Sequence, residues 1–154
     1  MFIRELMTKE VWTCRAHEPL ASAARIMWDH DVGAVPVLNA AGELAGVITD
    51  RDICMASYFT GKSLGEESVA AHMSTQLFTA APADRVEAAK EIMRSKQIRR
   101  LPVVDAAGQL VGMVSLGDLA RVATERGRKA VEPSEVLSTL AAIACPRPRL
   151  LVSA

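Results

Sequence analysis

Two stretches of the chain repeat the same order of hydrophobic and polar positions. In each, a short piece rich in β-branched or aromatic residues comes first, at 11–13 and again at 77–79. Apolar residues then recur every three or four positions, which predicts a helix with one apolar face. Two short apolar runs follow, at 34–38 and 44–49 in the first copy, joined by a segment that contains a glycine. This arrangement predicts a β-hairpin.

The second stretch is an internal repeat of the first. Residues 7–53 align with residues 73–119 at a constant shift of 66 and without a gap, and 13 of the 47 pairs are identical. Each copy closes with a helix that we expect to begin near Asp50 or Leu116, so each unit is predicted to be β-α-β-β-α. A unit of about 50 residues buries little of its own surface, and we expect the two units to pack together in an α+β fold.

Outside the two repeats, the sequence predicts a linker between the copies and a C-terminal helix with a tail. Two glycines between the copies favour a linker. Apolar residues at helical spacing behind Pro133 predict a further helix over 134–144, followed by a tail. The predicted divisions are a first domain at 1–60, a linker at 61–72, a second domain at 73–126, and a C-terminal helix and tail at 127–154.

Composition excludes several classes of protein. Eighteen basic and eighteen acidic side chains cancel, so no overall field attracts nucleic acid or an anionic membrane. The chain has neither an apolar run long enough to span a membrane nor the features of a signal peptide. Its three cysteines are odd in number and widely spaced, which argues against a disulfide framework. We expect a soluble cytoplasmic protein with no nucleic-acid or membrane partner.

Each predicted hairpin runs into its second helix through a hydroxyl residue and an aspartate three positions later. These pairs are Thr49 with Asp52 and Ser115 with Asp118. The spacing is typical of a capping box, in which both side chains satisfy free N–H groups at a helix start. A helix N-terminus also attracts anions, so the hydroxyl could meet phosphate or sugar oxygens while the carboxylate accepts hydrogen bonds from ribose. Both interpretations stay open, and the duplication favours the second.

No motif for catalysis or metal binding is present. The segment from Gly112 to Gly117 has one residue too many before its serine for a nucleophile elbow. The three histidines are scattered, and no glycine-rich dinucleotide fingerprint follows a strand. We therefore expect no enzyme, no catalytic residue, no metal site and no required cofactor.

The order and spacing of both repeats resemble the CBS domain, named for cystathionine β-synthase, and two in tandem resemble a Bateman module. The matching motifs are Met-Thr or Met-Ser, then Thr, then Ile-Met, then Leu-Pro-Val-Val-Asp, then Gly-x-Leu-Val-Gly before the Ser/Thr-x-x-Asp pair. The chain is similar in length and layout to small stand-alone bacterial CBS pairs. The resemblance, over residues 7–122, implies sheet-to-sheet packing about a pseudo-twofold axis. It also implies two clefts, which in many members bind AMP, ADP, ATP, S-adenosylmethionine or NAD.

The resemblance also implies roles for particular residues. The two aspartates would bind ribose, and basic residues at 99 and 100 occupy positions that often face phosphate; the alternative for these arginines is a solvated strand edge. The first copy has Gly33-Ala34 at these positions, so its phosphate would need Arg51 or an arginine reaching across, and we expect unequal sites. The expected ligand-binding residues are Thr13, Gly33, Ala34, Val47, Thr49, Asp52, Thr79, Arg99, Arg100, Met113, Ser115 and Asp118.

These expectations define two candidate functions. The first is a homodimeric regulatory module that senses an adenine nucleotide, AMP or ATP, or another adenosyl ligand, and alters an unidentified partner protein by a conformational shift. The second is a ligand-free scaffold for protein interaction, in which the hydroxyl–aspartate pairs only cap helices. An open cleft beside Ser115 and Asp118, lined by Arg99 or Arg100, would favour the first; a cleft filled by side chains would favour the second.

Overall fold

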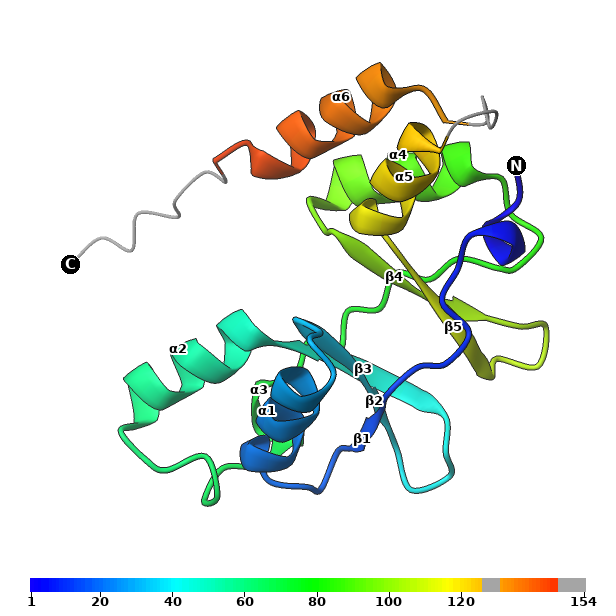
Figure 1. Cartoon of the computed structure of the whole chain (residues 1–154). Helices are drawn as coiled ribbons and strands as arrows, with labels where there is room; N and C mark the ends of the chain where they lie inside the picture. The colour runs from blue at the N-terminus through cyan, green and yellow to red at the C-terminus, as the bar shows by residue number, and fades with distance from the viewer. Residues whose placement is uncertain (126–130, 147–154) are drawn as a thin grey trace.

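The computed structural model describes residues 1–125 and 131–146, so most of the predicted tail lies outside the described residues. The chain forms two similar halves, one for each copy of the repeat, and in each half helices cover a small sheet (Figure 1). The two sheets lie toward the middle of the molecule, between the helices of the two halves. The α+β class expected from the repeat is confirmed.

The first half contains the first copy of the repeat. β1 pairs in parallel with β2, and β2 pairs in antiparallel fashion with β3. The apolar face of α1 is buried, as its spacing predicted. The hairpin and the helix start at Asp50 are confirmed. The elements are β1 (Cys14–Arg15), α1 (Leu20–Asp29), β2 (Ala34–Leu38), β3 (Leu44–Thr49) and α2 (Asp50–Thr60).

The second half follows the same plan. β4 and β5 form an antiparallel hairpin in the same register as β2 and β3 at a shift of 66. The second helix begins at Leu116, as predicted. The elements are α4 (Val86–Lys96), β4 (Arg100–Val104), β5 (Leu110–Ser115) and α5 (Leu116–Thr124).

The predicted first strand of each copy is wrong in position. In the first half the strand is Cys14–Arg15 rather than 11–13, and in the second half Ala80 makes only an isolated parallel bridge to Val103. The reason is that the preceding residues cross between the halves. Thr8 exchanges both backbone hydrogen bonds with Met113 of β5, at 2.9 Å each. The chain must then travel from the second sheet to the first before it can pair there.

The same crossing occurs at the equivalent place in the second copy. Ser74 exchanges backbone hydrogen bonds of 2.9 and 3.0 Å with Val47 of β3, so each half contributes a segment to the sheet of the other. Ile3, in a short 3₁₀ turn (η1, Ile3–Glu5), is buried in the core of the second half. Val69, in a short helix (α3, Val69–His72), is buried in the core of the first. Each core therefore takes residues from beyond its own repeat, and the predicted domain boundaries stay a prediction.

The segment around Thr8, which crosses to the second half, passes so close to β5 that this strand needs a glycine there. A Cβ added at Gly112 would lie 2.8 Å from Sδ of Met7 and 3.0 Å from the carbonyl oxygen of Thr8. We expect Gly112→Ala to lower the free energy of unfolding by about 1–3 kcal/mol, because a well-packed contact would have to open. Urea denaturation measures this change. Gly65→Ala is the control, since its Cβ would lie 3.9 Å from the nearest atom; equal losses in the two variants would contradict the argument.

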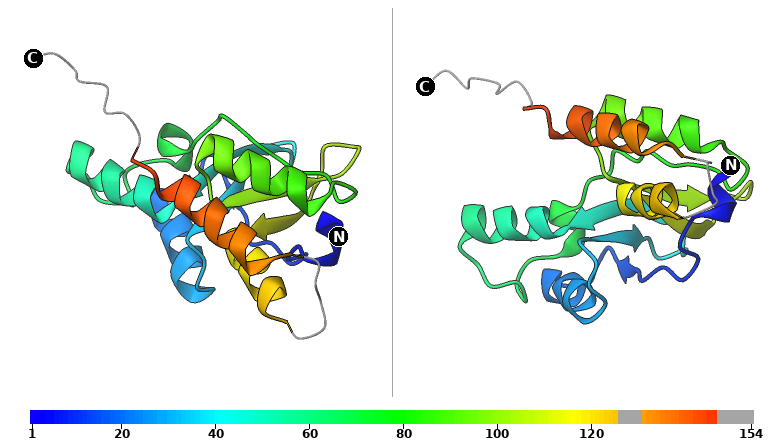
Figure 2. Two further views of the ribbon diagram at one scale, coloured as in Figure 1. Left: turned by 90° about the horizontal axis from the view of Figure 1, so that it is seen from above. Right: turned by 45° about the horizontal axis from the view of Figure 1, so that its top comes forward.

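A further helix, α6 (Pro133–Ala144), packs across α4 and α5 of the second half, at the position predicted behind Pro133 (Figure 2). Lys90, only 7% exposed, donates a 2.5 Å hydrogen bond to Oε2 of Glu135 on α6. This bond lowers the pKa of Glu135. At the other end, the side-chain amide of Gln97 donates to the carbonyl oxygens of Ala142 (3.2 Å) and Cys145 (2.9 Å). Helix α6 is therefore tied to α4 at both of its ends.

None of the helices within residues 1–125 and 131–146 is long and apolar enough to cross a membrane.

Candidate functional site

Both hydroxyl–aspartate pairs form capping boxes. Oδ2 of Asp52 accepts hydrogen bonds from the backbone N–H of Thr49 (2.8 Å) and from its hydroxyl (2.7 Å), and the N–H of Asp52 donates to Oγ1 of Thr49 at 3.2 Å. Ser115 and Asp118 repeat the three bonds at the same distances. Helix capping therefore uses one oxygen of each carboxylate and leaves the other oxygen for a second task.

The second oxygen has a different environment in the two copies. Asp118 is 6% exposed, and its Oδ1 accepts a hydrogen bond from the guanidinium of Arg121. Asp52 is half-buried, and within the part of the chain that the structure describes its Oδ1 has no hydrogen-bond partner. A ribose could therefore reach Asp52 directly, whereas at Asp118 it would have to displace Arg121. Sequence reasoning missed Arg121, although its spacing of three residues from Asp118 on a helix was a usable signal.

The strand register sets the two arginines beside the start of α5. Arg100 lies opposite Ser115 across the hairpin, just as Ala34 lies opposite Thr49 in the first half. The N–H of Leu116 donates to the carbonyl oxygen of Arg99 at 2.9 Å. Both arginine side chains are exposed, and neither makes an ion pair with any described residue. The place is therefore a concentration of positive charge beside a helix N-terminus.

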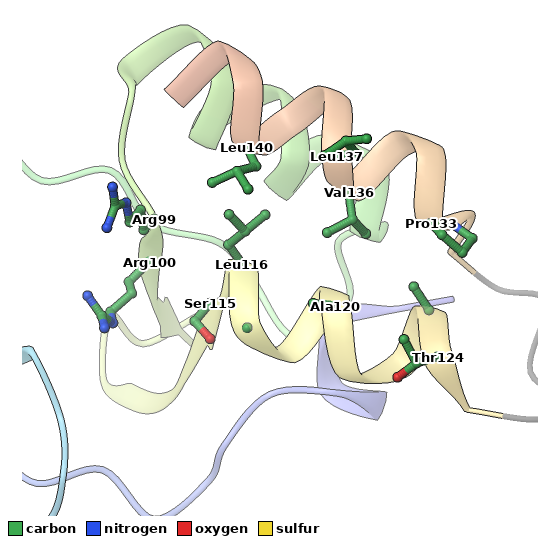
Figure 3. A pocket seen from close by; sticks show the side chains of 12 residues that line it. Arg99, Arg100, Ser115, Leu116, Ala120, Thr124, Pro133, Val136, Leu137 and Leu140 are labelled. Carbon is green, nitrogen blue, oxygen red and sulfur yellow. The ribbon is translucent and has the colours of Figure 1, made fainter. Parts of the chain in front are cut away.

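A cavity of about 590 Å³ opens between α5 and α6 next to these arginines (Figure 3). Arg99, Arg100 and Ser115 lie at one end of it, and side chains of the two helices, all apolar except Thr124, line the remainder. Asp118 does not line it. Residues of α6 were not expected at a site, because no local pattern shows which helix will close a cavity. The apolar lining is Leu116, Ala120, Ala123, Val136, Leu137 and Leu140, with Pro133 at the far end.

The two halves approach one another at Gly33. A Cβ added there would lie 3.4 Å from Nη2 of Arg100 and 3.0 Å from Oδ2 of Asp50. Arg100 of the second half thus reaches the helix start of the first half. Asp50 was missed in the sequence analysis, since only this cross-half contact places it near the arginines.

The other expected site residues lie on the strands of the two halves or just before them. Val47 and Met113 are half-buried, two residues before the capping hydroxyls and therefore on the same face of their strands. Thr13 and Thr79 are half-buried just before the first pairing residue of each half. No hydrogen bond among the described residues joins either threonine to the arginines. The structure therefore brings together Gly33, Arg99, Arg100 and Ser115, but it does not place the threonines in contact with them.

Nothing among residues 1–125 and 131–146 forms a group of three histidine, cysteine or acidic side chains that could hold a metal ion. Cys14 is buried in the core of the first half, and desolvation raises the pKa of its thiol to about 11. This thiol is therefore protonated near pH 7 and acts as a small apolar side chain.

Comparison with known proteins identifies the fold and the repeat. The family model of the CBS domain matches residues 3–58 and 67–125. The CBS domain-containing protein YhcV of Bacillus subtilis is 42% identical over 77% of this chain and 82% of its own length. Hypoxic response protein 1 of Mycobacterium tuberculosis is 30% identical, again over 77% of this chain and 82% of its own length.

Among solved structures, the CBS domain pair of protein MJ0100 superposes with a TM-score of 0.70 and 26% identity. The match covers 79% of this chain and 94% of that one, which was solved in complex with 5′-methylthioadenosine and S-adenosylmethionine. Both repeats are matched by the same family model, and the architecture agrees with that of a solved domain pair. The chain belongs to the CBS domain family and contains two CBS domains in tandem.

Proposed function

We propose that this chain is a regulatory module that binds an adenine nucleotide, AMP or ATP, where its two CBS domains meet. The observation that carries the proposal is the exposed pair Arg99 and Arg100, of which Arg100 reaches Gly33 of the first half. Neither arginine has an acidic ion-pair partner among the described residues. Unpaired arginines beside a helix N-terminus favour a phosphate, because both the guanidinium groups and the positive end of the helix dipole attract an anion.

The remaining contacts follow from the geometry of the first half. Oδ1 of Asp52 is available to accept hydrogen bonds from the ribose hydroxyls, and Val47 and Met113 offer apolar surface to the base. Arg100, which reaches Gly33, supplies the positive charge that the first copy lacks. The complex of the MJ0100 domain pair with two adenosyl compounds supports the adenosyl class of ligand. The two arginines favour a phosphorylated member of that class.

Signalling would follow from a change in packing. The ligand would contact both halves, so it binds more tightly to one relative arrangement of the domains and shifts the population toward it. The module acts in this proposal as a homodimer without catalytic residues, and it alters an unidentified partner protein. The expected cytoplasmic location and the lack of a required cofactor stay predictions.

The scaffold function remains the second candidate, because both hydroxyl–aspartate pairs form complete capping boxes. In that case Thr49, Asp52, Ser115 and Asp118 only stabilise helix starts, and the cavity binds no small molecule.

Isothermal titration calorimetry with AMP, ATP, S-adenosylmethionine and NADH separates the two functions. We expect AMP or ATP to bind with a dissociation constant near 1 μM, about −8 kcal/mol, and more tightly than S-adenosylmethionine, which has no phosphate. Failure of all four ligands to bind the folded protein would contradict the proposal and favour the scaffold.

A further inference from the structure

The cavity between α5 and α6, the α5–α6 groove, is lined by apolar side chains that the core of the second half does not use. Helix α6 packs on that core through Val136, Thr139 and Ile143, which are buried. Leu137 and Leu140 also line the groove, yet they are 66% and 41% exposed (Figure 3). An open groove lined by large apolar side chains is typical of a site for an apolar ligand.

Helix α5 contributes a matching apolar wall. Leu116, Ala120 and Ala123 are spaced by four and three residues, so they lie on one face of α5. The side chains of Ala120 and Ala123 are small, which leaves room between the two helices. The volume of about 590 Å³ falls within the roughly 300–1,000 Å³ of small-molecule sites.

Positive charge lies at one end of the α5–α6 groove. Arg99 and Arg100 are at that end, and Thr124 and Pro133 are at the other (Figure 3). Among the described residues, no acidic side chain lines the groove and none forms an ion pair with either arginine. A guanidinium group binds a carboxylate through two parallel hydrogen bonds. The groove therefore matches a ligand with a carboxylate head group and an apolar tail.

The length of the groove limits the length of that tail. Leu116 and Thr124 are the first and last residues of α5, and a rise over eight residues of helix is about 12 Å. An extended chain advances about 1.2 Å per bond, which is a third of the length of a residue with three backbone bonds. A tail of about ten carbon atoms therefore reaches from the arginines to the far end of the groove.

We propose that the α5–α6 groove binds a single-chain fatty acid, with its carboxylate on Arg99 and Arg100 and its tail between the two helices. The inference goes beyond the proposed function, because one wall of the groove is α6, which lies outside the residues 3–58 and 67–125 that the CBS family model matches. The fatty acid shares only the two arginines with the proposed nucleotide, and its tail needs no contact with the first half.

Isothermal titration calorimetry with octanoate, decanoate, dodecanoate and tetradecanoate, each below its micellar concentration, tests the tail. We expect decanoate to bind with a dissociation constant of about 10–100 μM. The affinity should rise about two- to fourfold for each methylene group up to decanoate, because each buries further apolar surface. It should level off beyond dodecanoate, where the groove ends. A rise that continues unchanged to tetradecanoate, or no binding of any of the acids, would overturn the proposal.

The head group is tested with the same tail. Decyltrimethylammonium carries a positive charge, so it should bind at least about tenfold more weakly than decanoate. Arg99→Ala/Arg100→Ala should weaken decanoate binding by about tenfold or more. Equal binding of the cation, or unchanged binding in the variant, would show that the arginines do not hold the ligand. If decyl phosphate bound more than about tenfold tighter than decanoate, the groove would belong to a phosphorylated lipid, and the fatty acid would be wrong.

A pair of variants tests the apolar wall. Leu137→Ser/Leu140→Ser should weaken decanoate binding by about tenfold or more, because apolar contact with the tail is lost. Tyr58→Ser/Phe59→Ser is the matched control, since it removes two α2 side chains that are 76% and 74% exposed and do not line the groove. Its affinity should change by less than about twofold. Equal losses in the two variants would indicate unspecific adsorption to exposed apolar side chains.

Filling the groove should shorten the acid that fits. Ala120 lies one helical turn from Leu116 and is exposed, so Ala120→Phe should place a ring in the path of the tail while the protein stays folded, as circular dichroism checks. Octanoate and decanoate should then bind equally; a chain-length profile like that of the wild type would place the tail elsewhere. Titration of the wild type with ATP separates the two proposals. Binding of ATP without decanoate refutes only the fatty acid, and binding of decanoate without ATP refutes only the nucleotide.

Discussion

Replacing Arg99 and Arg100 together by alanine is expected to weaken the binding of AMP or ATP by about 100-fold. Each charged hydrogen bond to a phosphate contributes about 1.5–3 kcal/mol, and 1.4 kcal/mol corresponds to a factor of ten. Both side chains are exposed, so their removal leaves no buried group without a partner and the fold should remain intact. Calorimetric titration of the variant with ATP measures the change.

Among the adenosyl ligands, the loss of affinity should be specific for those that carry a phosphate. S-adenosylmethionine lacks a phosphate, so its affinity should change by less than about threefold, within the range of ordinary surface substitutions. Lys9→Ala/Arg25→Ala is the control, because it removes two exposed positive charges that have no ion-pair partner among the described residues. If the control lost ATP affinity to the same extent, the effect would come from net charge, and the arginines would not form a site.

The substitution Asp118→Ala is expected to lower the free energy of unfolding by about 1–3 kcal/mol, because half-buried donors lose the carboxylate that accepts their hydrogen bonds. It removes the acceptor for the N–H and hydroxyl of Ser115, and also for Arg121. Asp52→Ala removes the same cap at a half-buried position without a bound arginine, so its loss should be smaller, near the low end of about 0.5–2 kcal/mol for caps. Urea denaturation of both variants measures the difference.

The same two variants separate capping from ligand binding. Oδ1 of Asp52 is available to a ligand in the structure. Asp52→Ala should therefore weaken ATP binding clearly, although it lowers the free energy of unfolding only slightly. We also expect weaker binding in Asp118→Ala. A variant that binds ATP with wild-type affinity would remove its aspartate from the proposed site and leave it as a cap alone. Equal losses of stability in the two variants would contradict the role assigned to burial and to Arg121.

The helix starts show how far local chemistry can be predicted. The spacing of Thr49 and Asp52 indicated a cap, and the capping box is present with its expected bonds. A cap involves four consecutive residues, so its partners are already neighbours in the chain. The pattern could not show that Arg121 would donate a hydrogen bond to Oδ1 of Asp118, whereas Oδ1 of Asp52 has no partner among the described residues. That difference depends on burial, which is set by the packing of the whole second half.

The wrong positions of the first strands have a similar origin. The pieces at 11–13 and 77–79 are rich in the β-branched or aromatic residues of strands, but they lie where the chain passes from one half to the other. Strand propensity reports how a residue fits a sheet once a neighbouring strand is present. Here the neighbour is reached only at Cys14 and Ala80, and the exchange of Thr8 and Ser74 between the halves decides where pairing begins.

The two copies of one unit, the hairpins and helices of each copy and the capped helix starts could be predicted from the sequence alone, because periodicity and capping act over a few neighbouring residues. The CBS family followed from the resemblance of the repeated motifs to that domain. Three features appear only in the folded chain: each half lends a segment to the sheet of the other, Arg100 reaches Gly33, and α6 closes a cavity beside Arg99. These contacts join residues far apart in the chain. They arise because each copy alone buries too little apolar surface, so the two copies fold against each other and the packed pair sets which side chains meet.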